Sequence, residues 1–141
     1  MKFWDTSALV PTFVDELSSG RIRATLANDQ DVVVWWATIV ECVSAIARRE
    51  RVEENGTAKA RRAYDSLDRL SLAWSEIPPS NALRDDARRL VRVHDLRAAD
   101  ALQLAAARVA SDDSPETLPF VTLDDRLAIA AGREGFPVLG L

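Results

Sequence analysis

The chain has 141 residues, which is long enough for one domain with a buried core and no disulfide bonds. Its composition, 48% hydrophobic and 28% charged, excludes a disordered or fibrous protein, and no apolar run approaches the length of a membrane span. A net charge of -4 argues against a protein that binds nucleic acid through a broad basic surface. It does not exclude a nuclease, because a divalent-metal site needs several carboxylates.

The sequence also indicates a cellular compartment. The single cysteine, Cys42, cannot form an internal disulfide bond or a cysteine metal site, which is typical of a protein in the reducing cytoplasm. Asp5 falls where an export signal would need apolar residues, so we expect no such signal. No repeat, linker or low-complexity tract divides the chain. We therefore expect a single domain over residues 1–141, in the cytoplasm and not in a membrane.

Short apolar runs alternate with helical patterns along the chain. Residues 32–35 (VVVW) have the character of a buried strand, and residues 98–110 are apolar nearly all round, as in a central helix. The pattern predicts strands at residues 2–4, 32–35, 73–77, 120–122 and 137–139, and helices at about 16–28, 38–51, 57–70, from Pro78-Pro79-Ser80 to about 94, 98–110 and 124–133. This alternation predicts an α/β fold in which crossover helices join parallel strands.

Acidic residues follow the predicted strands. Asp5 ends the first strand, Glu41 lies in the first turn of the helix after the second strand, and Asp124 comes directly after the fourth. Asp100 stands near the start of the central helix. The carboxyl ends of parallel strands share one edge of the sheet, and ligands bind beyond that edge. We therefore expect these four acids to converge.

Two of these acids also fit purely structural roles. Asp5 is compatible with a turn that simply ends a strand. Glu41 lies three residues after Thr38, which is the spacing of a capping box, in which the glutamate accepts a hydrogen bond from the amide of the cap residue. Either interpretation would account for the acid without any chemistry.

The other two acids are harder to explain in structural terms. Thr122 and Asp125 have the spacing of a second capping box, which leaves Asp124 without a structural task of its own. Asp100 stands in an apolar helix, where an ionised carboxylate is costly unless a cation pairs with it. Arg97 is a structural candidate for that partner, and a metal ion is the functional one.

A divalent cation would relieve the repulsion among clustered carboxylates, which otherwise raises their pKa values and lowers stability. Mg²⁺ and Mn²⁺ prefer oxygen ligands and keep several waters. Such an ion can activate water, stabilise charge on a phosphoryl oxygen and orient an in-line attack. We expect the hydroxyls of Thr6, Ser7 and Thr122 to orient the carboxylates by hydrogen bonds.

Four segments contain these acids in a characteristic order. They are DTSAL from Asp5, TIVE from Thr38, LRAADALQLA from Leu96 and FVTLDDRL from Phe120. Together they resemble the PIN domain, and within it the VapC-like toxins of bacterial toxin–antitoxin pairs. The family's acidic positions fall on Asp5, Glu41, Asp100 and Asp124, with Asp124 preferred to Asp125 because of the Thr-x-Asp-x-Arg-Leu register.

The resemblance implies a PIN-like (Rossmann-like) three-layer α/β/α sandwich whose central, mostly parallel sheet has about five short strands. It implies a Mg²⁺- or Mn²⁺-dependent endoribonuclease, a hydrolase that leaves a 5′-phosphate and a 3′-hydroxyl and inhibits translation as a toxin. Asp5, Glu41, Asp100 and Asp124 would then be both catalytic residues and metal ligands. The implied partners are an RNA substrate, a second copy of the chain in a homodimer, and a cognate VapB-like antitoxin.

Two other classes of function remain open at this point. A catalytically silent PIN-like module would bind RNA or protein with the same fold and no chemistry. A phospho-acceptor signalling domain is also a small parallel α/β unit with clustered aspartates, but it requires a lysine after a late strand. Neither Lys2 nor Lys59 follows a late strand, so the sequence favours the ribonuclease.

Overall fold

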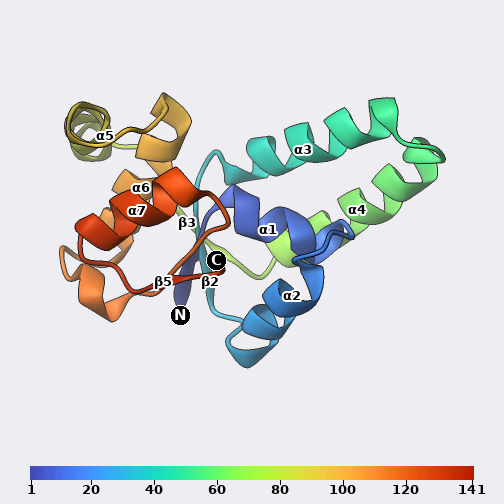
Figure 1. Ribbon diagram of the computed structural model, residues 1–141, viewed down its shortest axis with the longest axis horizontal. Helices are drawn as coiled ribbons and strands as arrows, with labels where there is room; N and C mark the ends of the chain where they lie inside the picture. The colour runs from blue at the N-terminus through green and yellow to red at the C-terminus, as the bar shows by residue number, and fades with distance from the viewer.

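A parallel sheet of five strands forms the middle of the molecule, with helices on both of its faces (Figure 1). The computed structural model describes residues 1–141. The strands are β1 (Lys2–Trp4), β2 (Val32–Trp35), β3 (Ser75–Ile77), β4 (Phe120–Val121) and β5 (Val138–Leu139), in the spatial order β3-β2-β1-β4-β5. Every neighbouring pair is parallel. The predicted α/β/α sandwich with a parallel sheet is therefore confirmed.

Seven helices connect the strands. They are α1 (Thr6–Phe13), α2 (Ser19–Asn28), α3 (Thr38–Val52), α4 (Gly56–Ser71), α5 (Asn81–Val93), α6 (Ala98–Ala110) and α7 (Asp125–Arg133), with a 3₁₀ turn, η1, at Pro115–Thr117. In Figure 1, α5, α6 and α7 cover one side of the sheet, α1 and α2 lie on the other, and α3 and α4 form a long hairpin that reaches outward. None of these helices is both long enough and apolar enough to cross a membrane.

Alternating side chains on the central strand β1 build two separate cores. Phe3 belongs to the core under α5, α6 and α7, whereas its neighbour Trp4 belongs to the core under α1 to α4. Both side chains are fully buried. Because successive residues of a strand point to opposite faces, two adjacent apolar residues show that both faces of β1 are covered. The end of β1 is thereby held between two packed layers.

The structure differs from the sequence-based expectation between β1 and α2. Residues 6–13 form the helix α1, which the sequence pattern did not predict, and α2 begins at Ser19 rather than near residue 16. Pro11 lies inside α1, and a proline in a helix interior normally argues against a helix. Asp5 supports the start of this helix, because its side chain caps the helix by accepting a hydrogen bond from the backbone N–H of Ser7.

Glu134 joins the three helices that cover one face of the sheet. It stands at the C-terminal end of α7, and its carboxylate lies 2.8 Å from Nη2 of Arg89 on α5 and 3.1 Å from Nη1 of Arg108 on α6. His94, at the end of α5, has its Nε2 atom 2.7 Å from the same carboxylate. Arg89 is the largest cause of a pKa for Glu134 that is lowered to about 2.

Replacing this carboxylate should weaken the fold in a pH-dependent way. We expect Glu134→Gln to lower the free energy of unfolding by about 1–3 kcal/mol at pH 7, because Arg89 and Arg108 each lose one acidic partner and keep only their other pairs, such as that with Asp86. The folded pKa is lowered to about 2, so the stabilisation is complete above pH 4.5 and is lost as the pH falls towards 2. Urea unfolding at pH 7, 4.5 and 3 measures the difference between variant and wild type. Glu116→Gln, an exposed acid without an ion pair, is the matched control, and equal stabilities of Glu134→Gln and wild type at pH 7 would contradict the prediction.

Candidate active site

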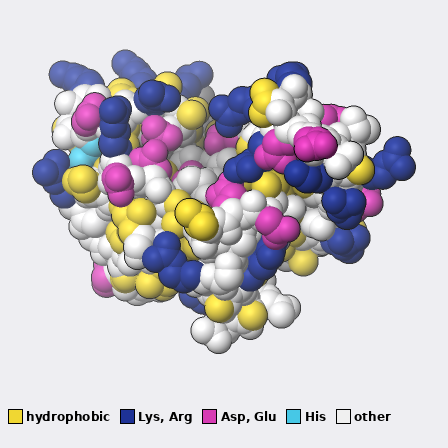
Figure 2. Space-filling model, turned by 45° about the vertical axis from the view of Figure 1, so that its right-hand side comes forward, with side chains coloured by type: hydrophobic (Ala, Val, Ile, Leu, Met, Phe, Trp, Pro, Cys, Tyr) yellow, Lys and Arg dark blue, Asp and Glu magenta, His cyan; other side chains and the backbone are white.

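The four acids that the sequence singles out line one groove at the carboxyl edge of the sheet. Asp5 follows β1, Asp124 follows β4, and Glu41 and Asp100 lie in the first turns of α3 and α6. Because β1 lies between β2 and β4, these segments meet although they are far apart in the sequence. Figure 2 shows a hollow between two lobes, with acidic side chains gathered at it and Lys and Arg side chains along the upper edges of both lobes.

Asp5 is the most buried of these acids, with 5% of its surface exposed. Its Oδ2 atom accepts hydrogen bonds from the hydroxyl of Ser7, from the hydroxyl of Thr122 at 3.0 Å and from the backbone N–H of Ser7 at 3.2 Å. Burial nevertheless raises the pKa of Asp5 to about 6, and the charge of Glu41 adds to the shift. The donors hold the carboxylate in place without fully compensating the cost of its charge.

Glu41 is held by side chains from two other helices. Its Oε2 atom accepts a hydrogen bond of 2.7 Å from the hydroxyl of Thr6 on α1 and one of 3.2 Å from the amide of Gln103 on α6. The predicted capping box of Thr38 and Glu41 is wrong. The cap residue of α3 is Ala37, and the Thr38 hydroxyl accepts a hydrogen bond of 3.1 Å from Gln103 instead. Glu41 thus points towards the groove rather than back to its own helix start.

Asp100 and Asp124 each stabilise the start of a helix. Asp100 accepts a hydrogen bond of 3.3 Å from the backbone N–H of Arg97, and Asp124 accepts one of 2.8 Å from the backbone N–H of Leu127. Asp124 is therefore the N-cap of α7. This corrects the expectation that Asp124 has no structural task and that Thr122 and Asp125 form the capping box.

Thr122 does not cap α7, because its hydroxyl takes part in other hydrogen bonds. Its hydroxyl donates to Asp5 and accepts a 3.1 Å hydrogen bond from the backbone N–H of Asp124. Arg97 was the structural candidate for the partner of Asp100. It donates a hydrogen bond from its backbone N–H to Asp100 and forms no ion pair with it. Burial is the largest cause of the raised pKa of Asp100, and the charge of Asp124 raises it further.

All four acids share one pattern of hydrogen bonding. In each, one carboxylate oxygen accepts hydrogen bonds from the protein, and the other has no protein donor: Oδ1 of Asp5, Oε1 of Glu41, Oδ1 of Asp100 and Oδ2 of Asp124. None of these free oxygens is a fully buried, unpaired atom. The ion pairs of the chain involve other acids. The groove therefore presents fixed oxygen donors, and none of the four acids forms an ion pair.

Oxygen donors of this kind suit a hard divalent cation, which is bound through one or two carboxylates and several waters. The positions of the side chains do not form a complete cage, because no three acidic, histidine or cysteine side chains are placed so as to hold one ion together. The donor set is thus suited to an ion that takes the rest of its shell from water.

Two residues that bear on the groove, Arg48 in its lining and Gln103 buried behind it, were not predicted from the sequence. Gln103 is buried in the apolar helix α6, where the sequence signal was a single amide on an apolar face. Arg48 lies seven residues after Glu41, and the spacing of three to four residues through Ser44 and Ala45 puts all of them on one face of α3 that lines the groove. That helical spacing is the sequence signal that could have identified Arg48 as a residue of the groove.

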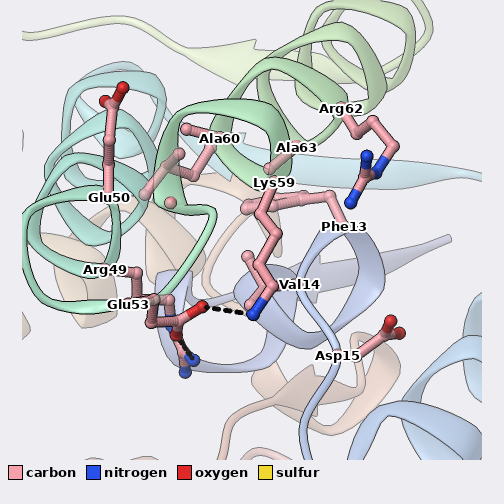
Figure 3. A pocket seen from close by; sticks show the side chains of 12 residues that line it. Phe13, Val14, Asp15, Arg49, Glu50, Glu53, Lys59, Ala60, Arg62 and Ala63 are labelled. Atoms are coloured by element: carbon pink, nitrogen blue, oxygen red, sulfur yellow. Dashed lines mark hydrogen bonds and ion pairs between the residues drawn. The ribbon is translucent and has the colours of Figure 1, made fainter.

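A second pocket, of about 260 Å³, lies where α3 and α4 meet the end of α1 (Figure 3). Phe13 and Val14 form part of its apolar wall, and Lys59 reaches across to Glu53, with 3.5 Å between the charged groups. Glu53 also pairs with Arg49. None of the four acids lines this pocket, although Arg49 lines both it and the acidic groove.

Comparisons with solved structures identify proteins of the same fold. VapC20 of Mycobacterium tuberculosis, a sarcin-ricin loop cleaving toxin, is 18% identical with a TM-score of 0.68, over 96% of each chain. FitAcB of Neisseria gonorrhoeae is 19% identical with a TM-score of 0.67, over 99% of this chain and 96% of that one. PAE2754 of Pyrobaculum aerophilum is 19% identical with a TM-score of 0.64, over 92% of this chain and 83% of that one. At such identities the likeness shows a shared fold.

Sequence comparison establishes the family. No curated protein matches the chain in sequence. The model of the PIN domain family, in contrast, matches residues 2–133. That range includes every segment that lines the groove, from the end of β1 to the start of α7. This chain therefore belongs to the PIN domain family.

Proposed function

We propose that this chain is a Mg²⁺- or Mn²⁺-dependent endoribonuclease and acts as the toxin of a toxin–antitoxin pair in the cytoplasm. PIN domains are generally nucleases, and the chain belongs to that family. The observation that carries the proposal is the groove of four carboxylates, each with one oxygen held by the protein and the other free. Such a groove attracts divalent cations and would repel RNA without them.

In this proposal, Asp5, Glu41, Asp100 and Asp124 hold the metal. A bound divalent ion would activate water and neutralise charge on the scissile phosphate. Ser7 and Thr122 keep Asp5 in one orientation by donating to its Oδ2 atom. This arrangement leaves the opposite oxygen directed to the groove. The two hydroxyls thus prepare a rigid, charged group at the bottom of the site before any substrate binds.

Arg48 supplies positive charge at the edge of the same groove. It is exposed, and it forms no ion pair, whereas its neighbour Arg49 pairs with Glu16 and Glu53. An arginine without a partner is available to contact a phosphate oxygen. Seven residues of helix span about 10 Å, so Arg48 would contact a phosphate next to the scissile one rather than the reacting group itself.

The partners belong to the same proposal. We expect an RNA substrate, a homodimer and a VapB-like antitoxin that covers the groove. One similar structure, VapC20, is a toxin. Val40 lines the groove and is 65% exposed, and Trp36, which directly follows β2, is 53% exposed; such exposed apolar residues support contact with another protein chain.

Removing a metal ligand should abolish cleavage. We expect Asp5→Asn and Asp100→Asn each to lower the cleavage rate by more than about 100-fold, because changes outside the ligand shell alone cost about 10- to 100-fold. The assay incubates pooled cellular RNA with the purified, antitoxin-free chain and Mn²⁺ or EDTA, and maps the new ends.

The matched control for this assay is Asp125→Asn, which changes an exposed acid next to Asp124 and should cleave within about threefold of wild type. Full activity of Asp100→Asn would contradict the assigned roles. Cleavage by wild type that persists in EDTA would contradict the metal dependence.

The buried charge of Asp5 should reduce stability in the absence of metal. Its folded pKa is raised to about 6 from 3.8, so the folded state binds more protons between these values and the free energy of unfolding falls as the pH rises through them. In EDTA at pH 7.5, we expect Asp5→Asn to be more stable than wild type by about 2–3 kcal/mol. The gain should vanish at pH 4. Urea unfolding at the two pH values measures it, and an Asp5→Asn protein that is less stable at pH 7.5 would overturn the prediction.

Loss of Arg48 should weaken RNA binding without disabling the chemistry. We expect Arg48→Ala to raise KM by about three- to tenfold with kcat nearly unchanged, and to lower the salt slope of RNA binding by about one. Arg69→Ala, an exposed arginine on α4 outside the groove, should change neither quantity. Steady-state cleavage and filter binding at several salt concentrations distinguish the two variants, and equal effects at both positions would argue against a specific phosphate contact.

A further inference from the structure

Gln103 is the polar exception in the buried part of α6. Ala101 and the residues from Leu104 to Ala107 are apolar and buried, Leu102 is apolar and partly buried, and Gln103 itself is 1% exposed. A buried amide is costly unless both its N–H groups and its oxygen find partners. The hydrogen-bond partners of Gln103 therefore indicate its role.

The amide of Gln103 connects α6 to two other helices. Its Nε2 atom lies 3.1 Å from the hydroxyl of Thr6 on α1, 3.1 Å from the hydroxyl of Thr38 on α3 and 3.2 Å from Oε2 of Glu41 on α3. Two N–H groups are thus shared among three oxygen acceptors. A carboxylate can only accept hydrogen bonds, so the amide nitrogen, and not the amide oxygen, faces Glu41.

The same network includes a direct bond between two of these acceptors. The hydroxyl of Thr6 donates to Oε2 of Glu41 at 2.7 Å and, through its lone pairs, accepts from Gln103. The Oε2 atom of Glu41 is therefore held from two directions, whereas Oε1 has no protein donor. A long side chain with several rotatable bonds is in this way restricted to one orientation at the groove.

We infer that Gln103 is a positioning residue, which orients the Glu41 carboxylate so that its free oxygen faces the groove. It acts together with Thr6, and it ties the central helix α6 to the first turn of α3, from which Glu41 projects. A solely structural amide would be satisfied by the hydroxyls of Thr6 and Thr38. The contact with Glu41 is the one that links it to the site. The inference rests on the proposed function, because Glu41 is a metal ligand only there.

Gln103→Met tests the inference, because it keeps a long unbranched side chain and removes both N–H donors. We expect it to lower the cleavage rate and the affinity for Mn²⁺, measured by calorimetry, by about 10- to 100-fold each. Leu104→Met changes the next buried residue of the same helix without touching the network, and it should leave both quantities within about threefold of wild type. Equal losses in the two variants would overturn the inference, since packing alone would explain them.

A double-mutant cycle with Glu41→Gln separates positioning from general destabilisation. If Gln103 acts through Glu41, the double variant Glu41→Gln/Gln103→Met should be no slower than Glu41→Gln alone, within about threefold. Effects that multiply would overturn the inference. Thermal unfolding of all four proteins verifies that each is folded at the assay temperature.

A crystal structure of Gln103→Met provides a readout that does not depend on activity. We expect Glu41 to leave its wild-type orientation or to occupy more than one, and an unchanged hydrogen bond between Thr6 and Glu41 would overturn the inference. The crystal structure also distinguishes a failure of the positioning role from a failure of the proposed function. Wild-type protein that neither cleaves RNA nor binds Mn²⁺ would refute the proposed function, whereas a Glu41 that moves only in Gln103→Met would still support the positioning role.

Discussion

Burial of several carboxylates at one edge of the sheet, where they also repel one another, is the constraint on which the rest of this structure depends. Asp5 is almost fully buried, yet its charge is met by hydroxyl and backbone donors rather than by a cation. The cost appears as raised pKa values of Asp5 and Asp100, for which burial is the largest cause and the charges of Glu41 and Asp124 are further ones. A fold that tolerates this cost must hold the acids rigidly, because otherwise they would turn away from one another into solvent.

The parallel sheet supplies that rigidity. Phe3 and Trp4 anchor the central strand in the cores on both faces, so the position directly after it, Asp5, cannot shift without disturbing two packed layers. Glu41, Asp100 and Asp124 occupy the first turns or caps of helices that begin at the same edge. At each position one oxygen accepts hydrogen bonds from the protein and the other has no protein donor. Under the proposed function, structural and chemical roles are combined in the same side chains.

Regular patterns of apolar residues made much of the fold, and the meeting place of the four acids, predictable from the sequence. Alternating strands and helices indicated a parallel α/β sheet, and the positions after the strands indicated where the acids would meet. The helix α1 was not predicted because Pro11 lies inside it, and proline normally argues against a helix. The capping box at Thr38 was wrong because Gln103, 65 positions away, forms a hydrogen bond with the Thr38 hydroxyl instead. Spacing along the chain cannot reveal partners that only the tertiary fold brings together. Gln103 was overlooked for the same reason.

The most direct test of the account is a crystal structure of the wild-type chain grown with Mn²⁺, with the anomalous signal of the metal measured. The account predicts a peak in the groove, about 2.1 Å from the free oxygens of at least two of Asp5, Glu41, Asp100 and Asp124. Side chains that rotate by a single torsion to reach it would agree with that prediction. An empty groove at saturating Mn²⁺, or a peak bound only elsewhere on the surface, would contradict it.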